Sequence, residues 1–369
     1  MTSPRAAIAR GIGAPFQIEP VELAPLRPDE AVVEIVAAGI CHTDMAMRDH
    51  KIYPVPHPIV MGHEGAGIVR EVGSAVTRVQ PGDHVALSFG SCGACPSCLS
   101  HRPSYCDLFY EYNFTGCRID HSTTLCQHGA PLHTFQSQGA FATRAVVAER
   151  AIVRVRKDVP LEYVAPMGCA VQTGAGAVLN SLALRPNQSI AIFGTGSVGL
   201  CALMAANLAG AGIIVAVDRV DSRLDLARSL GATHTINPTT TDVETELMAI
   251  TGGRGLDFTF DTTANMQVLR TGMAVLAKNG VCGFVGGAPK GMEVTVDVEH
   301  MMTGGRSLRG IILGDCDPDL FIPQMVDLFA LGRFPIDRII RTYPFDQINH
   351  AVEYSQSGRT VKPVLKMTS

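Results

Sequence analysis

The chain has 369 residues, of which 46% are hydrophobic and 17% charged, and its net charge at pH 7 is -4. This is the profile of a globular protein with ample apolar material, and it excludes an extensively disordered chain. The mild charge argues against nucleic acid or an anionic membrane surface as a partner. A chain of this length usually builds more than one core, so we expect two domains.

Neither a secretion signal nor a membrane span is evident in the sequence. Residues 1–10 lack an apolar stretch of signal-peptide length, and glycines interrupt the apolar stretch at 189–217. No run reaches the roughly 18 apolar residues that a span needs. The chain holds 11 cysteines, an odd number. Without a secretion signal, we expect metal ligands or buried thiols rather than disulfides, and a cytoplasmic location.

Residues 1–150 are predicted to be rich in β-strands, because short apolar runs alternate with Gly and Pro. The segment 107–140 is polar and without a clear period, so we expect a long surface excursion there. From about residue 186, strand-like and helical runs alternate, which predicts βαβ units and a parallel sheet. Two helical patterns and a final strand follow. The runs after residue 186 are 189–193, 198–209, 213–217, 222–230, 256–261, 266–277, 280–285, 318–331, 346–356 and 362–366.

A glycine-rich turn joins the first of these strands to the first of these helices. It reads Gly194-Thr195-Gly196-Ser197-Val198-Gly199, and the helix that follows would offer free N–H groups to a pyrophosphate. Asp218 lies about 20 residues further on, at the end of the second strand, where a carboxylate would bind an adenine ribose. That charge would repel a 2′-phosphate, which favours NAD over NADP, although Arg219 follows directly. The alternative is a turn that binds no nucleotide.

Four cysteines crowd one short segment, with two residues between the first three and seven before the last. They are Cys92, Cys95, Cys98 and Cys106. Four thiolates from one loop can complete a tetrahedral shell around zinc, and a complete shell leaves no place for substrate. The sequence therefore predicts a structural zinc site. A [4Fe–4S] cluster uses similar spacing and stays as the alternative.

Three further ligand-type residues lie far apart in the chain. Cys41, His63 and Cys169 are each unremarkable alone, since a single cysteine or histidine is usually a core or hydrogen-bonded residue. Together they would supply two thiolates and an imidazole, the pattern of a catalytic zinc with one open position. An alcohol whose oxygen took that position would have the pKa of its hydroxyl lowered by the zinc ion. Spacing alone does not bring the three residues together.

Over essentially its full length the chain resembles the zinc-containing medium-chain alcohol dehydrogenases. Gly62-His63-Glu64-x2-Gly67-x5-Gly73-x2-Val76 is similar to that family's signature, and the cysteine loop and the glycine-rich turn follow in the family's order. The aryl-alcohol (benzyl-alcohol) dehydrogenase branch is the most similar. The residues that carry this second resemblance are Cys41-His42-Thr43-Asp44, Gly168-Cys169-x2-Gln172-Thr173-Gly174-Ala175-Gly176-Ala177 and Phe345-Asp346-x-Ile348-Asn349.

The resemblance implies a role for each site residue. Cys41, His63 and Cys169 would bind the catalytic zinc, with Glu64 close behind it and able to enter the metal shell transiently. Asp44 would orient His63 through its other ring nitrogen. Thr43 would bind the alcohol and carry its proton toward the cofactor ribose. The residues that would bind the cofactor are His42, Thr173, Gly194, Gly196, Ser197, Val198, Gly199, Asp218, Arg223, Val285 and Lys362.

One position departs from the family. Many members carry a proton-accepting histidine five residues after the first cysteine ligand, and here that residue is Ala46. The proton would therefore finish its path through water or another group, with His50 as a weaker candidate. Phe89 would lie against the substrate. Other apolar or aromatic candidates for the pocket and its entrance are Met45, Met47, Ile312, Phe109, Tyr110, Tyr112 and Phe114.

These observations predict an α/β fold with a GroES-like β-rich catalytic domain (1–172 and 314–369) and a Rossmann domain with a doubly wound parallel sheet (173–313). We expect an NAD-dependent enzyme with two zinc ions per subunit, which reversibly oxidises primary aromatic or allylic alcohols such as benzyl alcohol, cinnamyl alcohol or geraniol. Two alternatives remain open, a thiol-dependent formaldehyde dehydrogenase of the same superfamily and a non-catalytic NAD-sensing zinc protein. The expected partner is a small-molecule alcohol or aldehyde, with no nucleic acid or membrane, and the chain is expected to form a homodimer or homotetramer.

Overall fold

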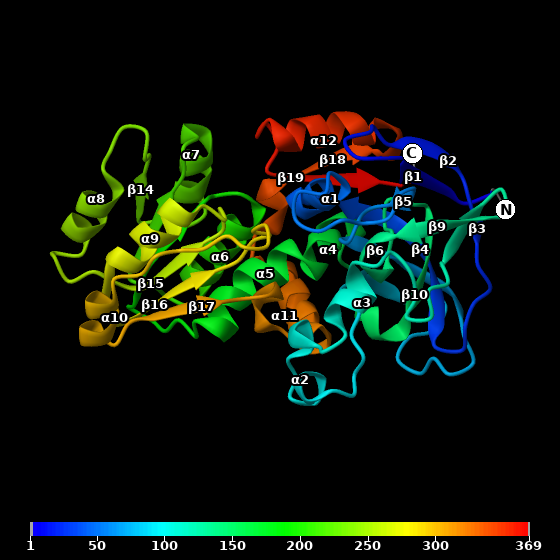
Figure 1. The fold of residues 1–369 in the computed structure, drawn as a ribbon, viewed down its shortest axis with the longest axis horizontal. Coiled ribbons are helices and arrows are strands. Elements are labelled where there is room, and N and C mark those ends of the chain that lie inside the picture. Colours follow the sequence, from blue (N-terminus) through cyan, green and yellow to red (C-terminus); the bar gives the residue numbers. More distant parts are fainter. Residues whose placement is uncertain (1–2, 368–369) are drawn as a thin grey trace. The chain divides into compact units, whose positions relative to one another are not determined.

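The computed structural model describes residues 3–367, and Figure 1 labels its helices and strands. The chain divides into two compact units. Unit 1 holds the residues up to 169, then 316–331 and the residues from 336 onward, while unit 2 holds 170–315 and 332–335. Within the described range, no helix is long and apolar enough to cross a membrane.

Unit 1 is dominated by strands with a few short helices. Its strands are β1 (Arg5–Ala9), β2 (Gln17–Pro20), β3 (Glu22–Leu23), β4 (Glu30–Gly39), β5 (Ile59–Val60), β6 (Gly65–Val72), β7 (His84–Leu87), β8 (Leu125–Gln127), β9 (Ala130–Thr134), β10 (Arg144–Ala148), β11 (Ile152–Val155), β18 (Ile340–Pro344) and β19 (Lys362–Lys366). Its helices are α1 (His42–Arg48), α2 (Pro96–Leu99), α3 (Phe109–Asn113), α4 (Leu161–Val164), α11 (Pro318–Ala330) and α12 (Ile348–Gln356).

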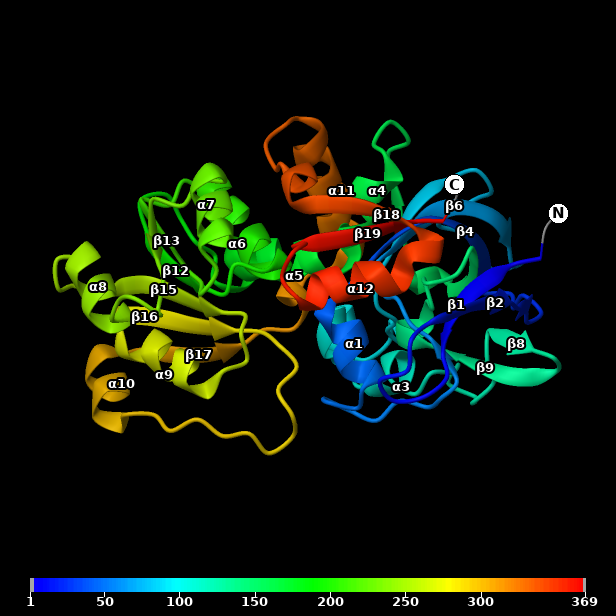
Figure 2. The same ribbon diagram turned by 90° about the horizontal axis from the view of Figure 1, so that it is seen from above.

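These strands form two sheets. One has the order β2-β1-β5-β9-β8-β3, and the other has the order β11-β7-β6-β4-β19-β18, with β10 also paired to β4. Strand β4 is ten residues long and almost wholly buried, as its Val- and Ala-rich sequence requires of a central strand. Helix α12 lies beside β18 and β19 in both views of the ribbon (Figures 1 and 2).

The register of β4 brings distant ligand-type residues to one place. On one side of β4, Ala38 pairs with Gly65, the first residue of β6, and on the other side Gly39 pairs with Val364 in β19. Cys41 therefore lies just beyond the end of β4, beside the start of β6 and the start of β19. His63 and Glu64 precede Gly65, so all three segments converge at this edge of the sheet.

The segment 107–140 is not the irregular surface excursion that its polarity predicted. It contains α3, β8 and β9, and Asn113, Phe135 and Gln138 are all at most 1% exposed. The prediction was wrong because buried side-chain amides help to hold this segment in place, and such contacts leave no periodic apolar pattern in the sequence. Asn113, for example, accepts a hydrogen bond from the Gly90 N–H and donates one to the Gly90 carbonyl.

Unit 2 is a parallel sheet with helices on both faces. Its strands are β12 (Ser189–Phe193), β13 (Ile213–Val217), β14 (His234–Ile236), β15 (Leu256–Asp261), β16 (Leu276–Phe284) and β17 (Ser307–Gly310). Its helices are α5 (Ala170–Gly176), α6 (Ser197–Leu208), α7 (Asp221–Ser229), α8 (Val243–Ile250), α9 (Met266–Ala274) and α10 (Val298–Gly304).

The order of this sheet is β14-β13-β12-β15-β16-β17, and every neighbouring pair is parallel. Helices α6 and α7 lie on one face of the sheet, and α9 and α10 lie on the other (Figure 2). Strand β12 is buried throughout, which is typical of a central parallel strand covered on both faces. The predicted α/β fold, with a β-rich part and a doubly wound part, is confirmed.

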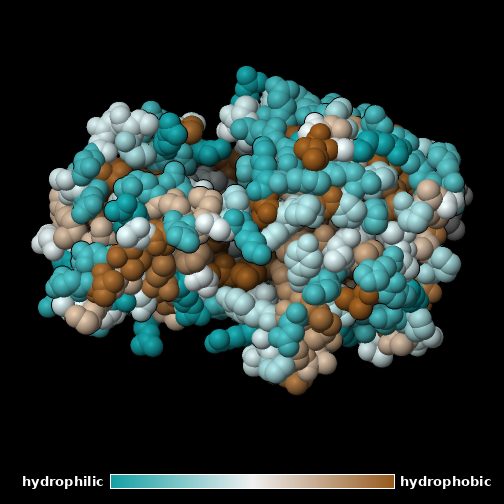
Figure 3. All heavy atoms as spheres, viewed as in Figure 1, coloured by the Kyte–Doolittle hydropathy of each residue, from teal (hydrophilic) through white to brown (hydrophobic). Residues whose placement is uncertain are grey.

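One end of this sheet is open in the described chain. Strand β17 is one of the two edge strands, β14 being the other, and the helix α10 before β17 exposes 69% of Val298 and 73% of Met302. Figure 3 shows apolar side chains over the part of unit 2 that Figure 1 labels α9 and α10. Exposed strand edges and apolar patches are places where protein chains associate.

Candidate active site

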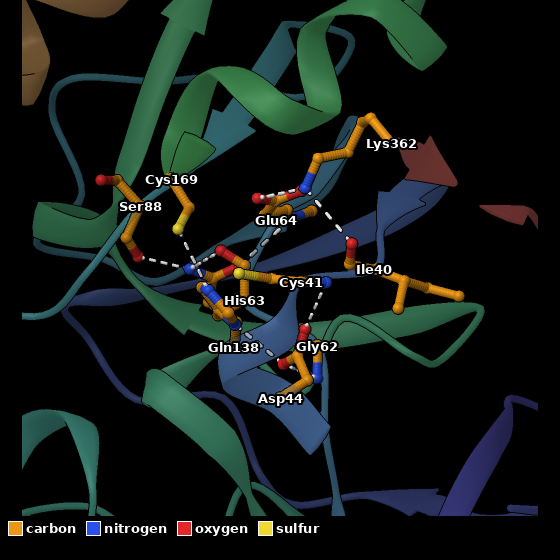
Figure 4. Close-up of polar contacts among 11 residues, drawn as sticks. Ile40, Cys41, Asp44, Gly62, His63, Glu64, Ser88, Gln138, Cys169 and Lys362 are labelled. Atoms are coloured by element: carbon orange, nitrogen blue, oxygen red, sulfur yellow. Dashed lines mark hydrogen bonds and ion pairs between the residues drawn. The ribbon is translucent and has the colours of Figure 1, made fainter. Parts of the chain in front are cut away.

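Four ligand-type side chains meet at the convergence point in unit 1. The ligand atoms of Cys41, His63, Glu64 and Cys169 all lie within 4.8 Å of one another. Cys41 is the residue before α1, and Cys169 ends the short helical turn that follows α4. Figure 4 shows the two sulfur atoms and the His63 ring directed toward one another. The structure therefore brings together the residues that spacing alone left apart.

Asp44 fixes the orientation of the His63 ring. The two side chains are buried, and His63 Nδ1 lies 2.8 Å from Asp44 Oδ1. The same carboxylate accepts hydrogen bonds from the backbone N–H groups of Gly62 and Cys41, at 3.1 and 3.0 Å. His63 Nε2 then faces Cys169 Sγ at 3.2 Å. A histidine held in this way by a carboxylate presents its other nitrogen to a metal.

The protonation states of this cluster fit a divalent cation. A hydrogen bond from Cys169, aided by the His63 imidazolium, holds the pKa of Cys41 well below its usual range despite burial. That contact with Cys41, together with burial, raises the pKa of Cys169. Burial opposes a charged His63, but Asp44 and the Cys41 thiolate outweigh it and raise its pKa. The cluster thus holds protons that a dication would displace, and two thiolates with an imidazole are a zinc donor set.

A buried ion pair lies behind the cluster. Lys362 Nζ is 2.9 and 2.8 Å from the two carboxylate oxygens of Glu64, and it donates to the Ile40 carbonyl at 3.2 Å. Burial raises the pKa of Glu64, and the ammonium offsets part of that rise. Gly39 makes the room, because a Cβ there would lie 1.9 Å from the Glu64 carboxylate.

This placement concerns Lys362, which the resemblance implied as a further cofactor-binding residue, and that role stays a prediction. Its side chain is 1% exposed, and its ammonium lies within hydrogen-bond distance of three acceptors, two on Glu64 and one on Ile40. The sequence carried no sign of this, because Lys362 and Glu64 are 298 residues apart. The pairing depends on β19 lying beside β4.

The four-cysteine loop forms a second cluster within unit 1. The ligand sulfurs of Cys92, Cys95, Cys98 and Cys106 lie within 4.8 Å of one another, and Cys92 Sγ is 3.9 Å from Cys98 Sγ. Around a single ion with zinc–sulfur bonds of about 2.3 Å, tetrahedral thiolates lie about 3.8 Å apart. The cysteines are free, and this separation far exceeds a disulfide bond. The geometry therefore favours one four-coordinate ion.

Backbone N–H groups support these thiolates. Those of Ala94 and Cys95 donate to Cys92 Sγ at 3.4 and 3.3 Å, and they lower the pKa of Cys92 to about 6. Those of Cys92 and Leu108 donate to Cys106 Sγ at 3.3 and 3.4 Å. Burial nevertheless raises the pKa of Cys106 to about 12. The loop thus directs N–H donors at two of its sulfurs, and a bound cation would stabilise the thiolate form of all four.

The glycine-rich turn lies in unit 2 between β12 and α6, as predicted. Gly194 has a positive φ of 86°, and a Cβ on Gly199 would lie 1.8 Å from the Gly194 carbonyl oxygen, so both positions require glycine. At Gly196 a Cβ would meet no atom within 4 Å, so this part of the turn is open. The open turn at the start of a 12-residue helix is a place for an anionic group.

Asp218 follows β13 and lies directly beside this turn. Its carboxylate accepts hydrogen bonds from Thr195 N and Thr195 Oγ1, at 2.7 and 2.8 Å, and from Val220 N at 3.0 Å. Arg223, on α7, brings its Nη1 to 4.0 Å from the same carboxylate. Asp218 therefore holds the turn in place through Thr195. Its contact with a ribose stays a prediction from the sequence.

The other predicted residues have varied surroundings. His42 is exposed and Thr43 half-buried at the start of α1, while in unit 2 Thr173 lies buried in α5 and Val285 follows β16. The Nε2 atom of His50 lies 2.9 Å from the carbonyl oxygen of Val55. The pocket candidates also separate. Phe89, Met45 and Met47 are buried, whereas Ile312 is 42% exposed and Tyr110 is 45% exposed.

Comparison with known proteins shows which families and relatives the chain is similar to. Residues 27–157 match the alcohol dehydrogenase GroES-like domain, and residues 197–330 match the zinc-binding dehydrogenase domain. Geraniol dehydrogenase of Castellaniella defragrans is 42% identical over 98% of this chain and 97% of its own. The crystal structure of benzyl alcohol dehydrogenase from Acinetobacter calcoaceticus has a TM-score of 0.96 at 42% identity, covering all of both chains. S-(hydroxymethyl)glutathione dehydrogenase of Escherichia coli is 33% identical over 98% of this chain and 99% of its own.

The chain is therefore a zinc-binding dehydrogenase in its fold and domain content. It belongs to the zinc-containing medium-chain alcohol dehydrogenase family, and it is an alcohol dehydrogenase rather than a non-catalytic binding protein. The family resemblance read from the sequence is confirmed.

Proposed function

We propose that this alcohol dehydrogenase reversibly oxidises primary aromatic or allylic alcohols to aldehydes, with NAD as the hydride acceptor. The observation that carries the proposal is a path of aromatic rings that begins at His63. Phe135 packs against the His63 ring in an edge-to-face arrangement at 5.5 Å. Phe114 stacks on Phe135 at 6.1 Å and on Tyr53 at 5.7 Å, and Tyr53 is 37% exposed. The path thus runs from the candidate metal ligand to the surface of unit 1.

This aromatic path suits flat, unsaturated substrates. Aromatic rings prefer offset-stacked or edge-to-face neighbours, so a benzyl or allylic group would gain contacts there that a saturated chain would not. Phe109 and Tyr110 extend the path, since each packs against Phe114, and Phe89 packs against Phe109. The relatives named for geraniol and benzyl alcohol act on alcohols of these two kinds.

In the proposed reaction, Cys41, His63 and Cys169 would hold the catalytic zinc, which would act as a Lewis acid and lower the pKa of the alcohol. Asp44 keeps the His63 ring in place, and Thr43, two residues after Cys41, accepts the alcohol proton and passes it toward the cofactor ribose. Because Ala46 stands where many family members carry a histidine, the proton would leave through water or another group. Cys92, Cys95, Cys98 and Cys106 would hold the structural zinc.

NAD is the proposed cofactor because Asp218 lies beside the glycine-rich turn. A carboxylate there binds ribose hydroxyls and repels a 2′-phosphate. His42 would donate to the pyrophosphate, and Arg223, Thr173 and Val285 would complete the cofactor site. A homodimer or homotetramer stays part of the proposal, supported by the open edge at β17 and the exposed apolar residues of α10. The cytoplasmic location stays a prediction from the sequence.

A second candidate is the oxidation of a formaldehyde–thiol adduct, which the 33% identical Escherichia coli relative favours. That substrate carries charged groups, whereas the path that leaves His63 is made of rings. NADH formation would be measured with benzyl alcohol, cinnamyl alcohol, geraniol, cyclohexylmethanol, and formaldehyde with and without glutathione. We expect the first three to give the highest kcat/KM. Turnover restricted to formaldehyde with glutathione would overturn the substrate assignment and keep the fold and the family.

A further inference from the structure

Gln138 is a buried polar residue next to the candidate metal ligands, and neither the sequence nor the proposed reaction assigns it a role. Its side chain is 1% exposed. The amide donates from Nε2 to the His63 carbonyl at 3.2 Å and to the Ser88 carbonyl at 2.6 Å. Its Oε1 accepts a hydrogen bond from the Gly65 N–H at 3.4 Å. Figure 4 shows the amide lying between His63 and Ser88.

These contacts continue a backbone ladder that stops short of the ligands. Just beyond Gln138, the N–H groups of Ala140 and Phe141 donate to the carbonyls of Gly62 and Met61, both at 2.9 Å. Before Ala140 in the sequence, the side chain of Gln138 supplies the next contacts, to the His63 carbonyl and the Gly65 N–H. One amide thus takes the place of a neighbouring strand along the His63–Gly65 segment.

The backbone around Gln138 is held in an unusual conformation. Gln136 and Ser137 have positive φ angles of 50° and 56°, in the left-handed region that side-chain-bearing residues rarely adopt. Such residues persist where the surrounding structure requires them, and they cluster at functional sites. Here the turn directs the Gln138 amide inward, beneath His63.

The third contact reaches toward the other ligand. Gln138 is bound to the carbonyl of Ser88, and the Ser88 hydroxyl donates to the Gly168 carbonyl at 3.4 Å. Gly168 directly precedes Cys169, and a Cβ on Gly168 would lie 1.9 Å from the Leu87 carbonyl oxygen. The Cys169 segment is therefore packed tightly against the strand end that Gln138 holds.

We propose that Gln138 is a positioning residue that fixes the His63 segment relative to the Cys169 segment, and that it thereby sets how tightly the catalytic metal is held. The inference rests on the proposed metal site but not on the proposed substrate. Groups that orient metal ligands through hydrogen bonds typically contribute about 10- to 100-fold to metal affinity. Gln138 differs from Asp44 in that it acts on the backbone of the ligand segments rather than on a ligand ring.

The test replaces Gln138 by methionine, which keeps the length of the side chain and removes all three hydrogen bonds. Gln127→Met is the matched control, because Gln127 is 7% exposed and its amide also bonds to Glu19, Pro20 and Arg10, in the other sheet. Each protein is loaded with Co²⁺, whose visible spectrum distinguishes a site with two cysteines and a histidine from a four-cysteine site. Metal release to a chelator is then followed at each site without substrate or cofactor.

We expect Gln138→Met to alter the spectrum of the two-cysteine site and to speed metal release from it about 10-fold or more. The four-cysteine site and the Gln127→Met protein should behave as the unsubstituted chain. Release at the unsubstituted rate with an unchanged spectrum, or equal acceleration in Gln127→Met, would overturn the inference. The inference would also be overturned if the unsubstituted chain bound no metal at the two-cysteine site.

Gln138→Glu provides a second variant if the methionine protein does not fold. It keeps the acceptor for the Gly65 N–H but turns a carboxylate toward the carbonyls of His63 and Ser88, so the same acceleration is expected. Because no alcohol is present, the outcome is separate from the proposed substrate. Normal metal binding without any alcohol oxidation would contradict the proposed function, but it would not contradict the role proposed for Gln138.

Discussion

Replacing Lys362 by methionine tests the energetics of the buried ion pair behind the metal cluster. The exposed fractions of the Lys362 and Glu64 side chains are 1% and 0%, so the substitution leaves a carboxylate buried without its partner. Breaking a buried pair in this way typically costs about 3–5 kcal/mol. The carboxylate can escape the cost by taking up a proton. From an ordinary pKa of about 4.3, protonation at pH 7 costs about 3.7 kcal/mol, which limits the penalty.

The pH dependence follows from the same reasoning. In the variant, the folded pKa of Glu64 lies far above its unfolded value, so the penalty grows as pH rises above about 4.3 and shrinks as pH falls. Between pH 7 and pH 5.5 the destabilisation should fall by about 2 kcal/mol. Urea unfolding at both pH values, followed by near-ultraviolet circular dichroism, measures it.

The matched control is the double variant Lys362→Met with Glu64→Gln, which carries no buried charge at this place. It should recover most of the stability at pH 7 and show little change between the two pH values. A destabilisation of Lys362→Met below about 1 kcal/mol, or one equal at pH 7 and pH 5.5, would refute the account of a charged, mutually dependent pair.

Three further outcomes are expected. Cys169→Ser should abolish alcohol oxidation while NAD still binds, because the glycine-rich turn belongs to the other unit; retained turnover, measured as NADH absorbance, would contradict the three-ligand site. Asp218→Asn should raise the KM for NAD about 10-fold or more, since hydrogen bonds to a charged group contribute about 1.5–3 kcal/mol. An unchanged ratio of kcat/KM for NAD and NADP would place cofactor choice elsewhere. Phe114→Leu should lower kcat/KM for benzyl alcohol about 2- to 10-fold more than for cyclohexylmethanol, because aromatic pairs contribute about 0.5–1.5 kcal/mol. Equal losses, or the same effect in Phe329→Leu, a half-buried ring that packs against Tyr163, would argue against selection by the aromatic path.

Local sequence was enough to predict the features that are themselves local. The glycine-rich turn lies between a strand and a helix that their apolar patterns announced, and the four cysteines of the metal loop fall within 15 residues. In both places the chain supplies the chemistry and the geometry in one segment. The doubly wound sheet was predictable for the same reason, because alternating strand and helix patterns leave few topologies.

The rest depends on tertiary register, which no local pattern encodes. Cys41, His63 and Cys169 meet because Ala38 pairs with Gly65 and because Gly168 packs on Leu87, and only the family resemblance indicated this. The pairing of Lys362 with Glu64 has the same origin. Gln138 lay in a segment predicted to be a surface excursion, because buried amides leave no hydrophobic period for sequence reasoning to detect.

In the proposed reaction, hydride passes directly from the alcohol carbon to NAD. Benzyl alcohol carrying two deuterium atoms on its reacting carbon tests this claim most directly, with the nicotinamide product analysed by mass spectrometry and NMR. We expect one deuterium at the reactive carbon of the nicotinamide ring and none acquired from D₂O when unlabelled alcohol is used. The reaction should be lost when zinc is removed by a chelator. A reduced cofactor without deuterium from the alcohol, or oxidation that continues at full rate in the zinc-free protein, would contradict the proposed reaction.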